Sequence, residues 1–336
     1  MKSKKYEIIF FILGVIAIII MLYNLGYVTL IENLKRTSWY FIPVIALRLV
    51  IYIINAVSWR YVTFFNKEDR KLVSFSKMLQ LTISGYAINY VTPVMPLGGE
   101  PYRILQLKEK IGGEKATSSV LNYAIIHILS HFVFWAFGCL LILLFVNTSK
   151  VLIILSIFFF LLSILMVVFT IKGYKNGIVV SFFVFLLHIP FVKKYVKRKM
   201  TSKFEENIKE IDKHIIDLYK NHRKSFYLSL FYETISRIVG CFEVLFIMYA
   251  IGINISFIGA IIISAETTLF ANMLFFSPMQ LGTREGGLVL ALKSLGYHSG
   301  AGIFMGIVMR ISELCWIMIG IGLIKLKDVR LLKSKI

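Results

Sequence analysis

The sequence has few charged residues, prolines and cysteines for a chain of 336 residues. Charged residues make up 17% of it, against about 25% in a typical soluble domain. Apolar types make up 58%, more than a soluble fold can hide from water and far more than a disordered chain carries. The composition therefore excludes a soluble or disordered protein and indicates one whose solvent is mostly lipid.

Motifs that would mark an enzyme are missing as well. The three cysteines, Cys139, Cys241 and Cys315, lie in apolar runs without metal-ligand or disulfide spacing, so we expect them to pack. His127 and His131 are four residues apart, but no nearby carboxylate completes a zinc site. No nucleotide-binding loop, dinucleotide fingerprint or nucleophile elbow occurs. We therefore predict no metal, no cofactor and no catalytic residue.

Acidic residues are half as frequent as basic ones, which leaves a formal net charge of +20. In a membrane protein such an excess collects in cytoplasmic loops and attracts anionic lipid heads, so we expect phospholipid partners and not nucleic acid. Basic clusters lie before Glu7, within Arg60–Lys77 and after Ile324. This distribution predicts a multi-pass protein of the cell membrane with both termini cytoplasmic, and it leaves homo-oligomers open.

Apolar runs of about 20 residues predict the membrane spans. Seven such runs occur, of which the last three and the second carry one to three charged residues: between Glu7 and Glu32, Trp39–Trp59, Ala116–Ser149, Val151–Ile171, Phe226–Ile251, Ile255–Phe276 and Ala301–Ile324. A shorter run, Asn176–Val192, fits a span or an interfacial helix. Met78–Pro96 and Pro278–Tyr297 are apolar but interrupted by Pro and Gly. We predict an all-α, polytopic helical bundle with seven or eight spans and two broken or re-entrant segments.

One segment, Lys193–Lys224, is rich in charge. Its apolar residues recur at intervals of three and four, which predicts an amphipathic helix. Such a helix either lies on the cytoplasmic leaflet or links two membrane halves, and we favour the link. On this interpretation residues 1–336 are one transmembrane domain, with halves 1–192 and 225–336 joined by the linker 193–224.

Proline is scarce but concentrated, since three of the six prolines lie within Pro93–Pro101. Prolines break a helix, and lipid tolerates the break only where protein or a wet cavity satisfies the freed backbone groups. A second copy follows in the other half: Thr92-Pro93…Leu97-Gly98-Gly99-Glu100 is echoed by Ser277-Pro278…Leu281-Gly282…Glu285. The similarity is either due to chance or indicates a transporter built from internal repeats, with its site near the midplane of the membrane. We favour the transporter.

Ionisable residues are rare at membrane depth because each costs about 2.5–3.5 kcal/mol on insertion scales. Nine lie in or beside the apolar segments: Arg48, Glu233, Arg237, Glu243, Glu266, Arg284, Glu285, Arg310 and Glu313. Glu233 and Arg237 are four apart, and Arg310 and Glu313 three apart, so each pair can meet on one helix face. The set either holds helices together as ion pairs or lines a polar cavity, and we favour the cavity. Guanidinium groups suit a lipid phosphate, and carboxylates suit an amine or sugar hydroxyls.

Together, Asn89…Pro93…Gly98-Gly99-Glu100-Pro101…Arg103 and Pro278…Gly282…Glu285 resemble the flippase-like transmembrane region of the lysylphosphatidylglycerol synthase family. The resemblance implies a helical domain that moves a modified or glycosylated lipid between leaflets. In the full-length synthases this domain precedes a soluble domain that transfers lysine from lysyl-tRNA to phosphatidylglycerol. This sequence runs only to Ile336, so we expect the transferase part to be absent. The second motif is looser, because Thr283 and Arg284 separate its Gly and Glu.

We therefore predict a lipid translocator, driven by a lipid or ion gradient and not itself catalytic. The alternative is an intramembrane lipid-modifying enzyme related to phosphatidylglycerol lysyltransferase, and a weaker one is a partner subunit that does not transport. The expected substrate is a phospholipid that is anionic or aminoacylated in its head group. In our hypothesis Arg103, Arg237 and Arg310 contact its phosphate, and Glu100, Glu285 and Glu313 line the path of the rest of the head group. The predicted substrate-binding residues are Asn89, Pro93, Gly98, Gly99, Glu100, Arg103, Arg237, Pro278, Gly282, Glu285, Arg310 and Glu313.

Overall fold

A computed structural model describes residues 37–66, 68–91, 98–147, 149–177, 202–273, 280 and 282–333, with residues 28, 31, 32 and 35 before them. Within these ranges the chain is all-helical and contains no strand. Pro93 and Pro278 lie outside the described residues, as do 178–192 and nearly all of the first predicted span.

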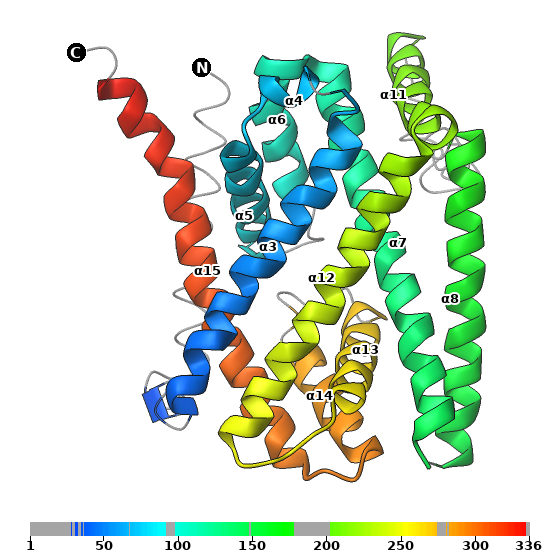
Figure 1. Cartoon of the computed structure of the whole chain (residues 1–336), viewed down its shortest axis with the longest axis vertical. Coiled ribbons are helices and arrows are strands. Elements are labelled where there is room, and N and C mark those ends of the chain that lie inside the picture. The colour runs from blue at the N-terminus through cyan, green and yellow to red at the C-terminus, as the bar shows by residue number, and fades with distance from the viewer. Residues whose placement is uncertain are drawn as a thin grey trace.

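Eleven α-helices and one short 3-10 helix make up the described part of the chain (Figure 1). They are η1 Ser38–Tyr40, α3 Phe41–Thr63, α4 Asp69–Leu72, α5 Phe75–Val91, α6 Gly99–Ile111, α7 Gly113–Phe145, α8 Lys150–Asn176, α11 Ser202–Asn221, α12 Arg223–Ala250, α13 Phe257–Met273, α14 Thr283–Ser294 and α15 Ser299–Lys333.

Four of the described helical stretches are long and apolar enough to cross a bilayer. They are Ser38–Thr63, Gly113–Phe145, Lys150–Lys175 and Ser299–Ile324, and each overlaps one of the predicted spans. The run Phe226–Ile251 lies almost entirely in α12, which carries three charged residues in this run and is not among the four. Helix α13 has only 17 residues. The total of seven or eight spans therefore stays a prediction.

Helix α8 shows most directly that the surrounding medium is apolar. Large side chains on one face are more than half exposed: Val151, Ile154, Phe158, Leu161, Leu165 and Phe169. Their spacing of three or four residues makes a continuous apolar stripe along the helix. Soluble proteins rarely expose such a patch, so this face is suited to lipid tails.

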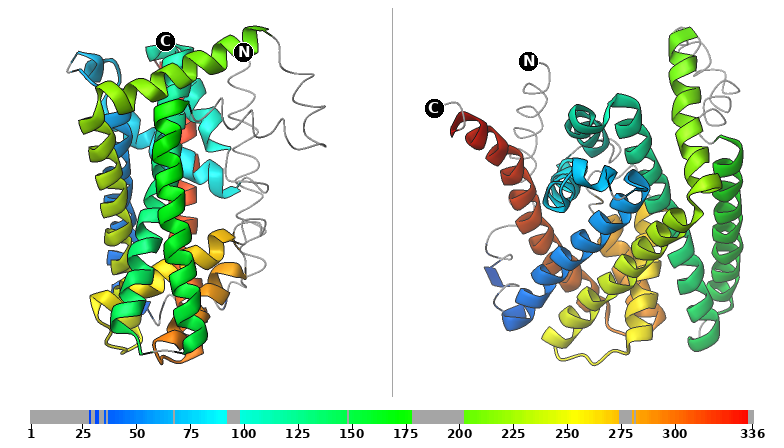
Figure 2. Two further views of the ribbon diagram at one scale, coloured as in Figure 1. Left: turned by 90° about the vertical axis from the view of Figure 1, so that its right-hand side faces the viewer. Right: turned by 45° about the horizontal axis from the view of Figure 1, so that its top comes forward.

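Eight of the described helices form two similar groups. Each group consists of a long helix, a hairpin of two short helices and a second long helix, and we call each group a triplet after these three parts. The first is α3, the hairpin α5–α6 and α7; the second is α12, the hairpin α13–α14 and α15. In Figures 1 and 2 the α5–α6 hairpin lies at the end of the molecule where α4 and α11 are found, and the α13–α14 hairpin lies at the opposite end. The two triplets therefore run in opposite directions.

Both hairpins have arms too short to cross a bilayer. At a rise of 1.5 Å per residue, the 17 residues of α5 span about 26 Å and the 12 residues of α14 about 18 Å. The hydrocarbon core is about 30 Å thick. Arms of this length fit broken or re-entrant segments. Helix α13, which lies in the predicted full span Ile255–Phe276, has 17 residues and forms an arm of the second hairpin.

Each hairpin packs against the second long helix of the other triplet, α5 against α15 and α13 against α7. A glycine permits the close approach in both places. A Cβ at Gly320 of α15 would collide with Ala87 and with the carbonyl of Ile83, and a Cβ at Gly138 of α7 would collide with Ala265. The long helices α3 and α12, one from each triplet, pack along each other.

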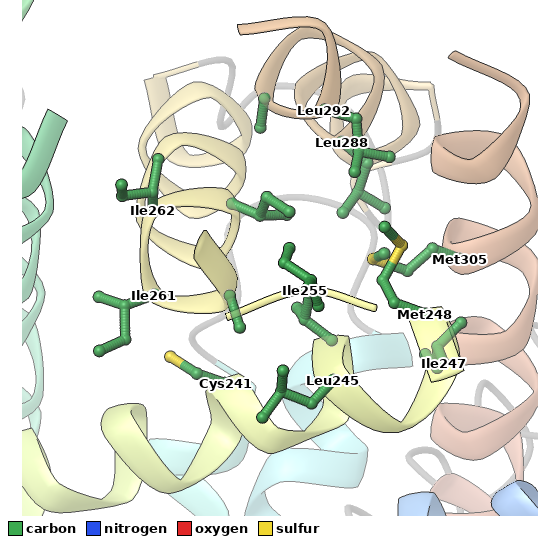
Figure 3. Close-up of a cluster of buried hydrophobic side chains, with 14 of the residues drawn as sticks. Cys241, Leu245, Ile247, Met248, Ile255, Ile261, Ile262, Leu288, Leu292 and Met305 are labelled. Carbon is green, nitrogen blue, oxygen red and sulfur yellow. The ribbon is translucent and has the colours of Figure 1, made fainter. Parts of the chain in front are cut away.

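The apolar interior is divided between the two ends of the molecule. One cluster joins α12, α13, α14 and α15 through side chains such as Met248, Leu288 and Met305 (Figure 3). Cys241 lies buried in this cluster, is not disulfide-bonded and serves as a packing residue. The second cluster joins α3, α5, α6, α7 and α12 around Trp59. Each hairpin is thus held by its own apolar cluster.

Helix α11 lies within the charged segment Lys193–Lys224 and is amphipathic, as predicted. Ile215 and Leu218 on its apolar stripe are fully buried. They belong to the same cluster as Tyr174 of α8 and Phe226 of α12. The stripe therefore faces the bundle, which is what a linking helix requires.

The packing of α5 on α15 predicts opposite effects for two glycines of one helix. Gly320→Ala should lower the thermal unfolding midpoint in detergent, because overpacking a tight contact costs about 1–3 kcal/mol. Gly322→Ala is the matched control, since nothing lies near its added Cβ. It should raise the midpoint slightly, because alanine is favoured over glycine in a helix by about 1 kcal/mol. Equal shifts for both variants would contradict the packing.

Candidate functional site

The two hairpins meet inside the bundle. Tyr90 is in the last turn of α5, and Arg284 is in the first turn of α14. Nη2 of Arg284 donates a hydrogen bond of 2.7 Å to the Tyr90 hydroxyl, and the guanidinium also lies 5.9 Å from the centre of the Tyr90 ring. The contact joins residues that are 194 apart in the chain, so the inner ends of the two hairpins come together.

A network of four charged side chains surrounds this contact, and we name it the Glu313 network. Arg48 of α3 donates to Glu243 of α12 at 2.9 Å and to Glu313 of α15 at 3.2 Å. Arg284 of α14 also pairs with Glu313, and Arg48 donates to the Ser312 hydroxyl at 3.0 Å. Two arginines and two glutamates give no formal net charge, so helices from both triplets are joined by balanced ion pairs.

Arg310 and Glu285 form a second buried pair beside this network. Nε and Nη2 of Arg310 donate to the two oxygens of Glu285 at 2.5 and 2.9 Å. Such a two-pronged contact is the strongest geometry available to a guanidinium and a carboxylate. Glu285 also accepts a 2.9 Å hydrogen bond from the backbone of Gly282. The second motif thus begins α14 and binds it to α15.

The first motif uses its residues in a related way. The side chain of Asn89 accepts from the backbone N–H of Gly99 at 2.6 Å and donates to Glu100 at 3.1 Å. A Cβ on Gly99 would collide with the Gly85 carbonyl, so glycine allows α6 to lie directly on α5. Gly98 is the residue that precedes α6. The amide of Asn89 therefore closes the hairpin across its break.

Arg103 is the most enclosed cation of the first half, with a side chain only 2% exposed. Its guanidinium donates to the carbonyls of Leu81 and Thr82 and lies 3.4 Å from Glu100. Three aromatic rings lie 5.0–5.6 Å from it: Trp59, Tyr86 and Tyr123. Cation–π contacts of this kind are strongest away from water, so Arg103 fixes α6 against α3, α5 and α7.

A third set of polar contacts joins α7 to α12, and we name it the His127 network. Nδ1 of His127 lies 2.7 Å from a carboxylate oxygen of Glu233 and 3.3 Å from the Tyr86 hydroxyl. Arg237 donates to the hydroxyl of Ser130 at 2.8 Å and to the carbonyl of His127 at 2.7 Å. In this network, too, every charged group of one helix is matched by polar groups of another.

The expected pairing along single helices is wrong. Glu233 binds His127 and Arg237 binds Ser130, both on α7. Likewise, Arg310 binds Glu285 of α14, while Glu313 binds Arg48 and Arg284. In a bundle interior the facing helix offers partners that complete the desolvated charge, whereas spacing along one helix only permits a contact. Glu266 lies apart from these networks and accepts from Ser294 of α14 at 3.1 Å.

The space between the networks is small in this structure. A cavity of about 10 Å³, room for one water molecule, is lined among others by Tyr86, Tyr90, Arg48 and Glu313. It lies between the Glu313 network and the His127 network and touches residues of both. A polar cavity that admits a lipid head group therefore stays a prediction.

Sequence reasoning missed the tyrosines. Tyr90 immediately precedes the first break and Tyr86 lies one turn earlier, yet neither was predicted as a site residue; phenol groups beside a motif break are the signal that could have found them. His127 was expected to line the bundle or hydrogen-bond within it rather than bind zinc, and it does hydrogen-bond there, but it was not predicted as a site residue. Among the described residues, no group of three or more His, Cys, Asp or Glu is placed to hold a metal ion.

The Glu313 network predicts a large effect for removal of its shared carboxylate. Glu313→Gln should destabilise the protein by about 3–5 kcal/mol, because it leaves a buried positive charge without its partner. The thermal midpoint in detergent measures this, and adding Arg284→Gln should restore part of the loss. Asp69→Asn is the control, since Asp69 and Lys115 are about a third exposed and such pairs contribute about 1 kcal/mol or less. Equal losses for both single variants would contradict the network.

Comparison with known proteins assigns the chain to a family. The family model described as "Lysylphosphatidylglycerol synthase TM region" matches residues 8–322, nearly the whole chain and both hairpins. No curated protein and no solved structure matches the chain. With an all-helical fold, four helices able to span a membrane and this match, the chain belongs to the family of the lysylphosphatidylglycerol synthase transmembrane region and has a membrane function related to lipids.

Proposed function

We propose that the chain is a translocator that moves a phospholipid or glycolipid between the two leaflets. The observation that carries the proposal is the contact of Tyr90 with Arg284, where two half-depth hairpins from opposite ends of the molecule meet. Broken helices that meet in a bundle interior are the usual location of a transport site. The family also links the chain to lipids and so to the class of substrate.

The opposite directions of the two triplets support alternating access. Helices α3, α5–α6 and α7 enter in one direction, and α12, α13–α14 and α15 enter in the other. Inverted repeats of this kind give a transporter two related conformations, each open to one side. Since the ion pairs of the Glu313 network join both triplets, they are the contacts that must exchange between those conformations.

A lipid head group can replace one member of a charged pair and bind the other. A phosphate can replace the carboxylate of Glu285 on Arg310, because a guanidinium binds both with the same two-pronged geometry. Arg237 donates to two polar partners and Arg284 to three, and both can take part. Arg103 is fixed by carbonyls and rings, so its contact with substrate is through Glu100. One carboxylate oxygen of Glu100 and one of Glu313 are buried and have no hydrogen-bond partner in the part of the chain that the structure describes, and these can accept from an amine or a sugar hydroxyl.

The charge distribution supports the orientation predicted above. Basic residues of α4, α6 and α11 gather at one end of the molecule, where α15 also ends. The loops that join α7 to α8 and α12 to α13, at the other end, hold few charges. Because basic loops remain in the cytoplasm, the end with α11 is the cytoplasmic one in this proposal.

The test is lipid movement in liposomes that contain the purified chain and a trace of acyl-chain-labelled aminoacyl or glycosyl lipid. Glu100→Gln should slow translocation by roughly 10- to 100-fold, because a lost hydrogen bond to a charged group is worth about 1.5–3 kcal/mol. Glu266→Gln is the matched control: it removes a membrane-depth carboxylate whose partner is Ser294, outside the proposed path. Its rate should equal that of the wild type.

Each outcome has a distinct meaning. Equal rates for Glu100→Gln and the wild type would overturn the site assignment. A wild type that moves none of the labelled lipids would overturn the proposed function. Conversion of one lipid into another, seen by mass spectrometry of the recovered lipids, would replace translocation by the enzymatic alternative.

A further inference from the structure

The contact between His127 and Glu233 has a composition that none of the other buried pairs shares. The arginine pairs keep their charge at any physiological pH, whereas imidazole changes charge between pH 5 and 8. Nδ1 of His127 lies 2.7 Å from Oε2 of Glu233, which is close enough for one proton to be shared. The pair therefore differs from the others in being able to gain or lose a proton.

Glu233 is enclosed in a manner that makes its proton occupancy matter. Its side chain is fully buried, and its second oxygen has no hydrogen-bond partner among the described residues. Keeping a carboxylate ionised in such a place costs several kcal/mol unless a nearby cation compensates its charge. The His127 side chain is 28% exposed, so protons can reach the pair through the imidazole.

The groups that face the pair come from every helix packed around it. Tyr86 of α5 lies 3.3 Å from Nδ1, and the ring of His131 lies 5.4 Å from that of His127. His131 itself has a buried Nδ1 without a hydrogen-bond partner among the described residues. The remaining neighbours are Tyr123 of α7, Arg237 of α12 and Asn55 of α3, with Arg103 of α6 behind the rings of Tyr86 and Tyr123. Arg103 is already paired with Glu100, so Arg237 and Glu233 balance each other around the imidazole, and Arg237 opposes a permanent imidazolium there.

The pair also lies at a mechanical junction. It connects α7 of the first triplet to α12 of the second, and Arg237 reinforces the same junction through the His127 carbonyl. Tyr86 is one turn from Asn89, which closes the first hairpin on Glu100. A change of proton occupancy at His127 therefore acts on contacts that hold the first hairpin and both triplets in place.

We infer that His127 and Glu233 form a proton-binding site that couples proton movement to lipid translocation. The inference rests on the proposed function and adds its energy source. A proton from water on one side adds to the imidazole of His127. The resulting imidazolium no longer accepts a hydrogen bond, and its charge strengthens its pairing with Glu233. After the conformational change the same proton leaves to water on the other side, so one proton enters and one leaves.

The experiment uses the full-length chain in vesicles of phosphatidylethanolamine and phosphatidylglycerol with a trace of acyl-chain-labelled lysylphosphatidylglycerol. A pH-sensitive dye inside the vesicles reports proton flux, and valinomycin with equal potassium holds the membrane potential at zero. With one proton per lipid, a difference of one pH unit should shift the leaflet distribution of the probe by about tenfold. Reversing the gradient should reverse the shift.

His127→Gln and Glu233→Gln should abolish this dependence, so that the distribution is the same for both gradients. His298→Gln is the matched control, because His298 is an exposed histidine whose imidazole accepts a hydrogen bond from the nearby Gly300 backbone. Its shift should equal that of the wild type. Infrared difference spectra over a pH titration supply a second readout, since the wild type should show a ring band of protonated imidazole that is missing in His127→Gln.

The outcomes separate this inference from the proposed function. Lipid movement with no response to the gradient and no proton flux would overturn the coupling and leave translocation in place. No lipid movement at all would overturn translocation of this lipid, and the infrared titration would then decide whether the proton site exists. A wild-type spectrum without an imidazolium band that is lost in His127→Gln would overturn the site.

Discussion

Charges buried in a membrane protein must be neutralised by one another, and this requirement organises the interior of the chain. Three arginines and three glutamates from α3, α12, α14 and α15 balance each other in the Glu313 network and the Arg310–Glu285 pair. Removing one partner leaves a charge in a medium that cannot solvate it, which is far more costly than losing an exposed pair. The positions of the long helices and of the second hairpin are therefore interdependent, and a displacement of one helix requires a new partner for its charge.

The backbone groups at the breaks of the two hairpins must also be satisfied inside the protein. A break in a helix frees backbone N–H and C=O groups that lipid cannot satisfy. In the first motif the Asn89 amide binds the backbone of Gly99, and in the second the Glu285 carboxylate binds the backbone of Gly282. Both motifs thus satisfy the start of the helix after the break with a polar side chain. The same side chains then contact an arginine or a carboxylate, so that the backbone break and the charged networks are physically one structure.

Hydropathy predicted the long helices well, because the cost of burying charge in lipid acts on each residue independently of its neighbours in space. The spans that became α3, α7, α8 and α15 are recognisable for this reason, and the repeated Pro–Gly motif located both hairpins. The partners of the buried charges could not be predicted in the same way. Spacing shows that Glu233 and Arg237 share a helix face, but His127 of α7 faces them only after the triplets are packed. The roles of Tyr86 and Tyr90 depend on the same packing, since a tyrosine in an apolar run looks like any other core residue until its hydroxyl finds a partner.

Charge balance also restricts which lipids can enter the networks. A head group with one phosphate and one ammonium adds no net charge, so it can take the place of an arginine–glutamate contact without leaving an excess. An anionic head group brings one negative charge, and a head group with two ammonium groups brings one positive charge. Either must be matched by a group of the protein that changes charge, and arginine cannot do so at physiological pH. Among the polar contacts of the described helices, the His127–Glu233 pair joins a fully buried carboxylate to an imidazole. If this pair binds a proton, as we infer, it supplies the adjustable charge that a neutral network of arginines and glutamates lacks, and one scaffold can then carry lipids of different charge.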